Sequence, residues 1–220
     1  MLFNFFKPKP NDEPLQAQSA DLLRFPEQFS IPCLEGENCD EITGAIGEFG
    51  RIPTNPIPVN GPLGEIKYLS RLHIKNGPGV IFHRLGSVNV PQLNLPVDVF
   101  ETVSLDGEVW DILYISMYHP RRSTKIPKSY VFSKFDKLLS LLPMGFGTLK
   151  CDPNFPFTID QFIERDLDIF GTGITNKRLA ERYREFIVDK DKFKRPTDHQ
   201  WKIVAVSASL NKTAYYQLTP

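Results

Sequence analysis

A basic segment, MYHPRRSTKIPK (117–128), contains the side chains with the clearest capacity to bind a ligand. It has no acidic residue, and three of its cations lie close together: Arg121, Arg122 and Lys125. An arginine can form two parallel hydrogen bonds with a phosphate or carboxylate, and a lysine adds a compact positive charge. We therefore predict that these three residues bind a small anionic ligand.

A second interpretation makes the same segment a solvated basic loop. The acidic stretch EGENCDE (35–41) carries the opposite charge through Glu35, Glu37, Asp40 and Glu41. Ion pairs between the two stretches would occupy the cations and would contribute little stability at the surface.

Arg84 is the fourth residue that we assign to ligand binding. In FHRLGS (82–87), successive side chains of a strand point to opposite faces, so His83 and Arg84 separate. His83 then faces the core as a structural histidine. Arg84 could reach an acid such as Glu101 or Asp111, either in a structural ion pair or as part of a polar site.

An enzyme would need an acid/base group beside such a ligand. His119 titrates near neutral pH and lies in the basic segment, so it is our candidate for proton transfer, with Glu101 or Asp111 to orient it. A carboxylate pair drawn from Glu65, Glu101 and Asp111 is a further arrangement of this kind. No nucleophile motif accompanies them, because the chain contains no G-x-S-x-G, H-E-x-x-H or C-x-x-C.

Neither a cofactor nor a metal is expected. The glycine run G-x-x-G-x-x-G (44–50) is followed by RIPTNPIP, which cannot start the helix that a dinucleotide motif requires, and no Gly-Lys-Ser/Thr follows. We interpret these glycines as turns, and a nest of amides that binds an anion is the alternative. The odd count of cysteines, Cys33, Cys39 and Cys151, predicts reduced thiols.

The clearest local element is the hairpin VDVFETVSLDGEVWDILYISMY (97–118). Two apolar strands meet at Asp106-Gly107, a dipeptide that suits a two-residue hairpin loop. The resulting register pairs Val103 with Trp110, Glu101 with Ile112, and Thr102 with Asp111. Glu101 and Asp111 are therefore expected on opposite faces of the sheet.

The segment before this hairpin predicts a second one. EIKYLSRLHI (65–74) alternates in the manner of a strand, although a helix is the runner-up, and VIFHRLGSV (80–88) returns after the turn KNGPG (75–79). NPIPVNG (55–61) is predicted to be a rigid extended connector that enters this hairpin, because its two prolines favour polyproline geometry and Asn-Gly supplies a turn.

The last third of the chain is mixed. Helices are predicted over 133–142, 157–170 and 175–190, and a terminal strand hairpin over 199–210 and 213–218. The sum is an α+β fold: a mainly antiparallel sheet of β-hairpins with two or three helices packed on one side. Clustered prolines predict an irregular N-terminal wrap over residues 1–62, with the α+β core over 63–220 in one domain.

Size and charge limit the classes of function. The 220 residues include 26 Lys+Arg and 26 Asp+Glu, so no net charge attracts nucleic acid or an anionic membrane. No apolar run approaches the ~20 residues that span a bilayer. The N-terminal MLFNFFKPKP lacks the order of a secretory signal, so we expect a cytoplasmic protein. A surface anchor formed by the aromatics of this stretch is the alternative.

These observations predict a non-catalytic binding or protein-interaction module whose partner is another protein or a small anionic ligand. The alternative is an enzyme that acts on a phosphorylated or carboxylated small molecule. The enzyme requires Glu101 or Asp111 to open into one pocket with His119 and an arginine. Ion pairs that bury both acids would weigh against it.

Overall fold

The chain has the expected α+β architecture, with a mainly antiparallel sheet. The computed structural model describes residues 40–93, 95–119, 121–133, 147–148, 152–161, 176–186, 189 and 191–210. Several predictions lie wholly or largely outside these residues: the helices over 133–142 and 157–170, the strand over 213–218, the three cysteines and the N-terminal residues 1–39.

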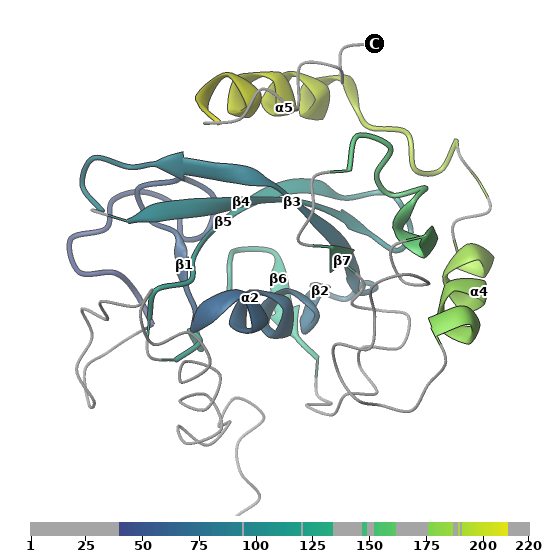
Figure 1. Ribbon diagram of the computed structural model, residues 1–220, viewed down its shortest axis with the longest axis horizontal. Coiled ribbons are helices and arrows are strands. Elements are labelled where there is room, and N and C mark those ends of the chain that lie inside the picture. Colours follow the sequence, from purple (N-terminus) through teal and green to yellow (C-terminus); the bar gives the residue numbers. More distant parts are fainter. Residues whose placement is uncertain are drawn as a thin grey trace, which may run out of the picture.

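The main sheet contains five strands in the order β1-β5-β4-β3-β7 (Figure 1). They are β1 (Ile57–Pro58), β5 (Trp110–Ser116), β4 (Pro96–Ser104), β3 (Val80–Asn89) and β7 (Gly147–Thr148). β5, β4 and β3 pair antiparallel, whereas the two short edge strands pair parallel with β5 and β3. A second sheet joins β2 (Leu72–Ile74) to β6 (Tyr130–Phe132).

The β4–β5 hairpin has the predicted register: Glu101 lies opposite Ile112, and Thr102 lies opposite Asp111. The turn differs from the prediction. The backbone N–H of Ser104 donates to Val109, so residues 105–108 form the loop, and only Gly107 adopts a positive φ, of 77°. The prediction of a two-residue loop was therefore wrong, although the strand pairing that it implied was right.

Residues 65–74 do not form a strand, and here the runner-up is correct. Helix α2 spans Gly61–Leu69, and only the final residues of the predicted strand belong to β2. Gly61 has a φ of 73°, and a proline occupies the first turn of the helix, where it costs no hydrogen bond. The NPIPVNG stretch is extended as expected, but it forms edge strand β1 and then leads into α2 rather than into a hairpin.

The predicted strand over 199–210 is also a helix, α5, which spans Thr197–Ser209. Its buried residues His199, Ile203 and Val206 recur at helical spacing. The helix predicted over 175–190 is confirmed as α4, Asn176–Phe186. Within the described part of the chain, no helix combines the length and apolar character that crossing a membrane requires.

Helices cover both faces of the sheet, where the sequence predicted one covered face. Figure 1 shows α5 above the sheet and α2 below it. On the α2 face, Tyr68 and Leu69 join a core with Phe100 and Leu113. On the α5 face, Ile203 and Val206 pack in a core that includes Val97, Val99 and Ile112. The sheet is thus buried on both sides, which explains why both faces of β4 and β5 are apolar.

Candidate functional site

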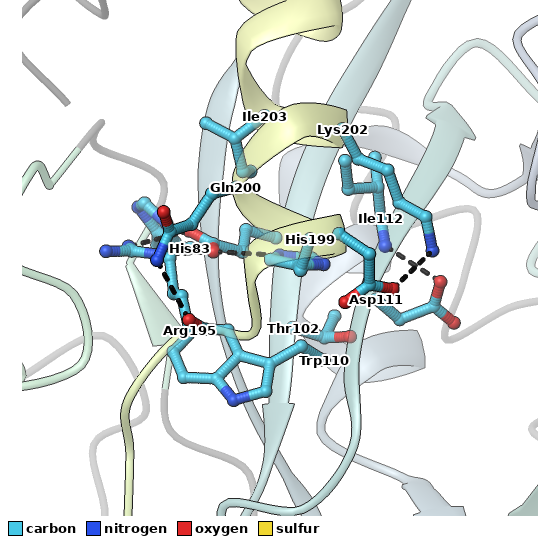
Figure 2. Close-up of polar contacts among 12 residues, drawn as sticks. His83, Thr102, Trp110, Asp111, Ile112, Arg195, His199, Gln200, Lys202 and Ile203 are labelled. Carbon is cyan, nitrogen blue, oxygen red and sulfur yellow. Dashed lines mark hydrogen bonds and ion pairs between the residues drawn. The ribbon is translucent and has the colours of Figure 1, made fainter. Parts of the chain in front are cut away.

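A buried polar cluster lies between β4 and residues 195–199, which include the start of α5 and are called the C-terminal segment below. Its centre is Glu101, whose side chain is 0% exposed. Glu101 Oε2 accepts a hydrogen bond from His83 Nε2 at 2.7 Å, and Oε1 accepts one from His199 Nε2 at 3.0 Å. Arg195 adds two more, from Nε to Oε1 at 2.7 Å and from Nη2 to Oε2 at 3.0 Å. Figure 2 shows Arg195 and His199 beside His83 and Trp110.

Hydrogen bonds at both ring nitrogens fix the orientation of His83. Its Nδ1 accepts the backbone N–H of Asp152 at 3.2 Å, so that nitrogen carries no proton. The proton therefore resides on Nε2, which donates to Glu101. The ring also stacks on Phe155 with centroids 4.0 Å apart. The prediction of a buried structural histidine is confirmed.

Arg195 supplies the positive charge that this buried carboxylate requires. Its guanidinium also lies 5.3 Å from the centre of the Trp110 ring. Burial alone would raise the pKa of Glu101, but hydrogen bonds from His199, His83 and Arg195 lower it far below its usual range. Glu101 is therefore a permanent carboxylate near neutral pH.

This cluster is an anchor rather than a proton-transfer site. Both oxygens of Glu101 already accept two hydrogen bonds each, so the carboxylate has no open position for a substrate proton. Arg195 and His199 connect the C-terminal segment to the middle of the sheet. Neither residue is predicted from the sequence: His199 falls in a stretch (199–210) that is predicted to be a strand, and Arg195 lies just before it. The helical spacing of His199, Ile203 and Val206 was the available signal.

Asp111 lies on the opposite face of the sheet, as the predicted register requires. It pairs with Arg51, accepts a hydrogen bond from the Tyr130 hydroxyl at 3.1 Å, and accepts the backbone N–H of Ile112 at 2.9 Å. Burial raises the pKa of Asp111 more than Arg51 and these hydrogen bonds lower it. Both acids of the enzyme alternative are therefore bonded inside the fold, and on different faces.

Arg84 binds neither of these acids, so that part of the prediction was wrong. It donates to Asp98 at 2.6 Å and to Ser87, and Ser87 donates to Asp98 at 2.8 Å. Glu65 of α2 is 1% exposed, and burial raises its pKa well above the usual value, with the charge of nearby Asp98 adding to the rise. A second polar cluster therefore lies between α2 and the sheet.

The basic segment is paired with the acidic stretch, as the second interpretation predicts. Arg121 Nη1 donates to Asp40 at 2.7 Å, and Lys125 pairs with Glu41. Asp40 also accepts the backbone N–H of Thr124 at 2.7 Å. Arg122 is only 6% exposed. A bound anion would have to compete with two carboxylates for Arg121 and Lys125.

His119 is buried beside Ser116, with its Nε2 3.1 Å from the serine hydroxyl. Burial lowers the pKa of His119 to about 4, so the ring is neutral at physiological pH. The structure does not bring His119 together with Glu101 or Asp111, since these acids have the partners given above. Across the parts of the chain described, no group of three His, Cys, Asp or Glu side chains is arranged to hold a metal ion.

The outer face of α5, opposite its buried residues His199, Ile203 and Val206, is apolar and exposed. Trp201 is 69% exposed and Val204 is 40% exposed. Ala205 and Ala208 are exposed on the same side of the helix. Beside them, Lys202 pairs with Asp198 at 4.0 Å.

Comparison of the chain with protein-family models, curated proteins and solved structures found no match.

Proposed function

We propose that this chain is a non-catalytic module that binds another protein through the outer face of α5. The exposure of Trp201, at 69%, carries the proposal. Tryptophan is usually well buried, and where it is exposed on a binding surface it is among the residues that contribute most to affinity. Val204, Ala205 and Ala208 extend the apolar face by two helical turns.

The attachment of α5 to the sheet supports this role. The inner face of the helix is fixed by His199 on Glu101 and by Ile203 and Val206 in the core. A surface that is already ordered loses little conformational entropy when it binds. The partner that fits has an apolar pocket for the indole ring, with polar groups at its rim to meet Lys202 and Asp198.

The enzyme alternative and the anion site have less support. The two acids that would serve an enzyme are bonded to Arg195 and Arg51, and His119 is buried beside Ser116. Arg121 and Lys125, which would bind an anion, already pair with Asp40 and Glu41. Ligand binding at Arg84, Arg121, Arg122 and Lys125 therefore stays a prediction from the sequence.

A matched pair of variants tests the proposal. Trp201→Ala removes the anchor, and Ile46→Ala removes a similarly exposed apolar side chain (75%) from the loop before β1. The tagged full chain is used for quantitative affinity capture from the cells that produce it, and melting temperatures are measured in parallel. We expect a protein that the wild type and Ile46→Ala retain and that Trp201→Ala loses, with unchanged melting temperatures.

The captured protein is then purified and titrated against each variant. A hot-spot tryptophan predicts a Kd that rises at least about tenfold on Trp201→Ala. If no captured protein distinguishes Trp201→Ala from the wild type, the outer face of α5 is not the binding surface.

A further inference from the structure

We propose that residues 121–125 form an anion-binding cradle for a phosphate group and that Asp40 and Glu41 occupy it as a built-in competitor. The Asp40 carboxylate lies in the cradle as a bound oxyanion would. Its Oδ1 accepts hydrogen bonds from Arg121 Nη1 and from the backbone N–H of Thr124, both at 2.7 Å, and its Oδ2 accepts one from the Thr124 hydroxyl at 2.9 Å. The inference does not depend on the binding surface proposed for α5.

The donors of the cradle are of the kinds that bind phosphate oxygens. Guanidinium groups, backbone N–H groups and hydroxyl groups all donate to phosphates in protein complexes. Lys125 adds a further positive charge, since its ammonium group pairs with Glu41. The cradle favours a negatively charged occupant: burial alone would raise the pKa of Asp40, but hydrogen bonds from Arg121 and Thr124 lower it below its usual value.

The charge balance favours a phosphate over a single carboxylate as the ligand. Asp40 and Glu41 together place two negative charges against the two positive charges of Arg121 and Lys125. A phosphate monoester carries a charge of about −1.5 to −2 at pH 7 and has three strong acceptor oxygens. It can therefore replace both carboxylates at once, whereas one carboxylate ligand would leave a cation without its countercharge. The ligand class that fits is a phosphorylated molecule.

The cradle is fixed to the fold by contacts that do not involve its occupants. The backbone N–H of Ser123 donates to the carbonyl of Pro58 in β1 at 2.9 Å. The Tyr68 hydroxyl of α2 donates to the carbonyl of Lys125 at 2.5 Å. These contacts hold both ends of the donor segment, so the donors stay in position when the two acids move away.

The occupants, in contrast, lie at the surface. The Asp40 side chain is 28% exposed and the Glu41 side chain is 46% exposed, so a ligand in solution can reach both ion pairs. Ion pairs of this kind contribute little stability, and a competing anion can therefore displace them. A ligand binds only those molecules whose cradle is open, so the two acids weaken its apparent affinity by that fraction.

Titration of the full chain with inorganic phosphate at constant ionic strength tests the proposal. Asp40→Ala/Glu41→Ala removes the occupants, and Glu48→Ala/Glu108→Ala removes the same charge from two exposed positions outside the cradle. Calorimetry is expected to give a phosphate Kd at least about tenfold lower for the first variant than for the wild type and the charge-matched control. Adding Arg121→Ala to the first variant should abolish this gain.

Two results of this titration would contradict the proposal. Equal phosphate affinity in the wild type and both double variants would overturn it. Acetate that binds to the emptied cradle as tightly as phosphate would overturn the assignment of the ligand as a phosphate group.

A second measurement uses only the wild-type protein and therefore holds even if Asp40→Ala/Glu41→Ala does not fold. In nuclear magnetic resonance spectra, added phosphate should shift the Thr124 amide and the Asp40 carboxyl carbon along one saturation curve, because the ligand takes the donor as the carboxylate leaves it. Chloride at the same ionic strength should leave both signals in place. Identical responses to phosphate and chloride would show that the cradle has no phosphate site.

Discussion

His199 Nε2 donates a 3.0 Å hydrogen bond to Glu101 Oε1 across 98 positions of sequence. Arg195 binds the same carboxylate, so one buried side chain of β4 receives the start of α5 and the segment before it. Residues 195–199 are thereby anchored to the sheet.

Glu101→Gln is expected to destabilise the protein by about 3–5 kcal/mol, because it leaves the largely buried Arg195 without its countercharge. The new amide group would also place a donor where only donors now converge. Urea unfolding at neutral pH measures the loss. Glu48→Gln, on a half-exposed side chain, should stay within about 0.5 kcal/mol of the wild type, and a similar small effect at Glu101 would contradict the anchor role.

Acidification is expected to destabilise the protein through His119. The unfolded chain binds a proton on this histidine near pH 6.5, whereas the folded protein does so only at about pH 4. The unfolded state therefore holds the extra proton between these values, and stability falls by about 1.4 kcal/mol per pH unit as pH decreases through this window. Urea midpoints of the wild type and His119→Gln should diverge there. If the two urea midpoints changed with pH in parallel, His119 would have the same pKa in the folded protein as in the unfolded chain.

The two adjacent arginines should respond differently to substitution. Arg121→Ala removes a partly exposed ion pair with Asp40 and is expected to cost less than about 1 kcal/mol. Arg122 is buried, so Arg122→Ala is expected to cost about 2 kcal/mol through lost packing. Urea unfolding of both variants measures the difference. The reverse order would mean that the Asp40 pair, not burial, holds this segment.

Gly107 and Gly44 provide a matched pair for the contact between the β4–β5 loop and the chain around Lys192. Both have a φ of 77°, so alanine is strained equally at each. A Cβ at Gly107 would collide with the Lys192 carbonyl oxygen, whereas a Cβ at Gly44 meets nothing within 4 Å. Gly44→Ala is expected to cost about 1–2 kcal/mol and Gly107→Ala distinctly more.

Melting temperatures of the two glycine variants test this ranking. Equal destabilisation would mean that the segment around Lys192 yields freely and is not held against the loop.

Local information in the sequence was enough to predict the β4–β5 hairpin. Its alternation and its Asp-Gly turn lie within one stretch of chain, so the register of Glu101 and Asp111 followed from counting. The exact loop did not follow, because Leu105 bonds to Gly79, a residue outside the hairpin.

The two helices were missed because tertiary packing overrode local preference. Ile203, Val204 and Val206 are β-branched residues that favour strands, yet α5 is helical because Ile203 and Val206 then fill the core over β4. In α2, burial of Glu65, Tyr68 and Leu69 on several sides hides the amphipathic stripe that would reveal a helix.

Which acid each candidate residue contacts depends on the three-dimensional fold, not on spacing along the chain. Arg84 bonds to Asp98 across the β3–β4 pair. No spacing in the sequence indicates that Arg84 contacts this acid rather than Glu101 or Asp111. Charge composition did predict that the basic segment pairs with residues 35–41, since Asp40 and Glu41 are the acids that it contacts.

The hydrogen bond from Ile112 N–H to the Asp111 carboxylate bears on self-association. Outward-facing backbone groups of β5 are occupied within the chain: Tyr114 donates to Gly50, and Ser116 accepts from Val59. With Ile112 bonded to its neighbour's side chain, this margin of the sheet offers few free groups to an incoming strand. Asp111 thus occupies one backbone donor that a strand added alongside β5 would need.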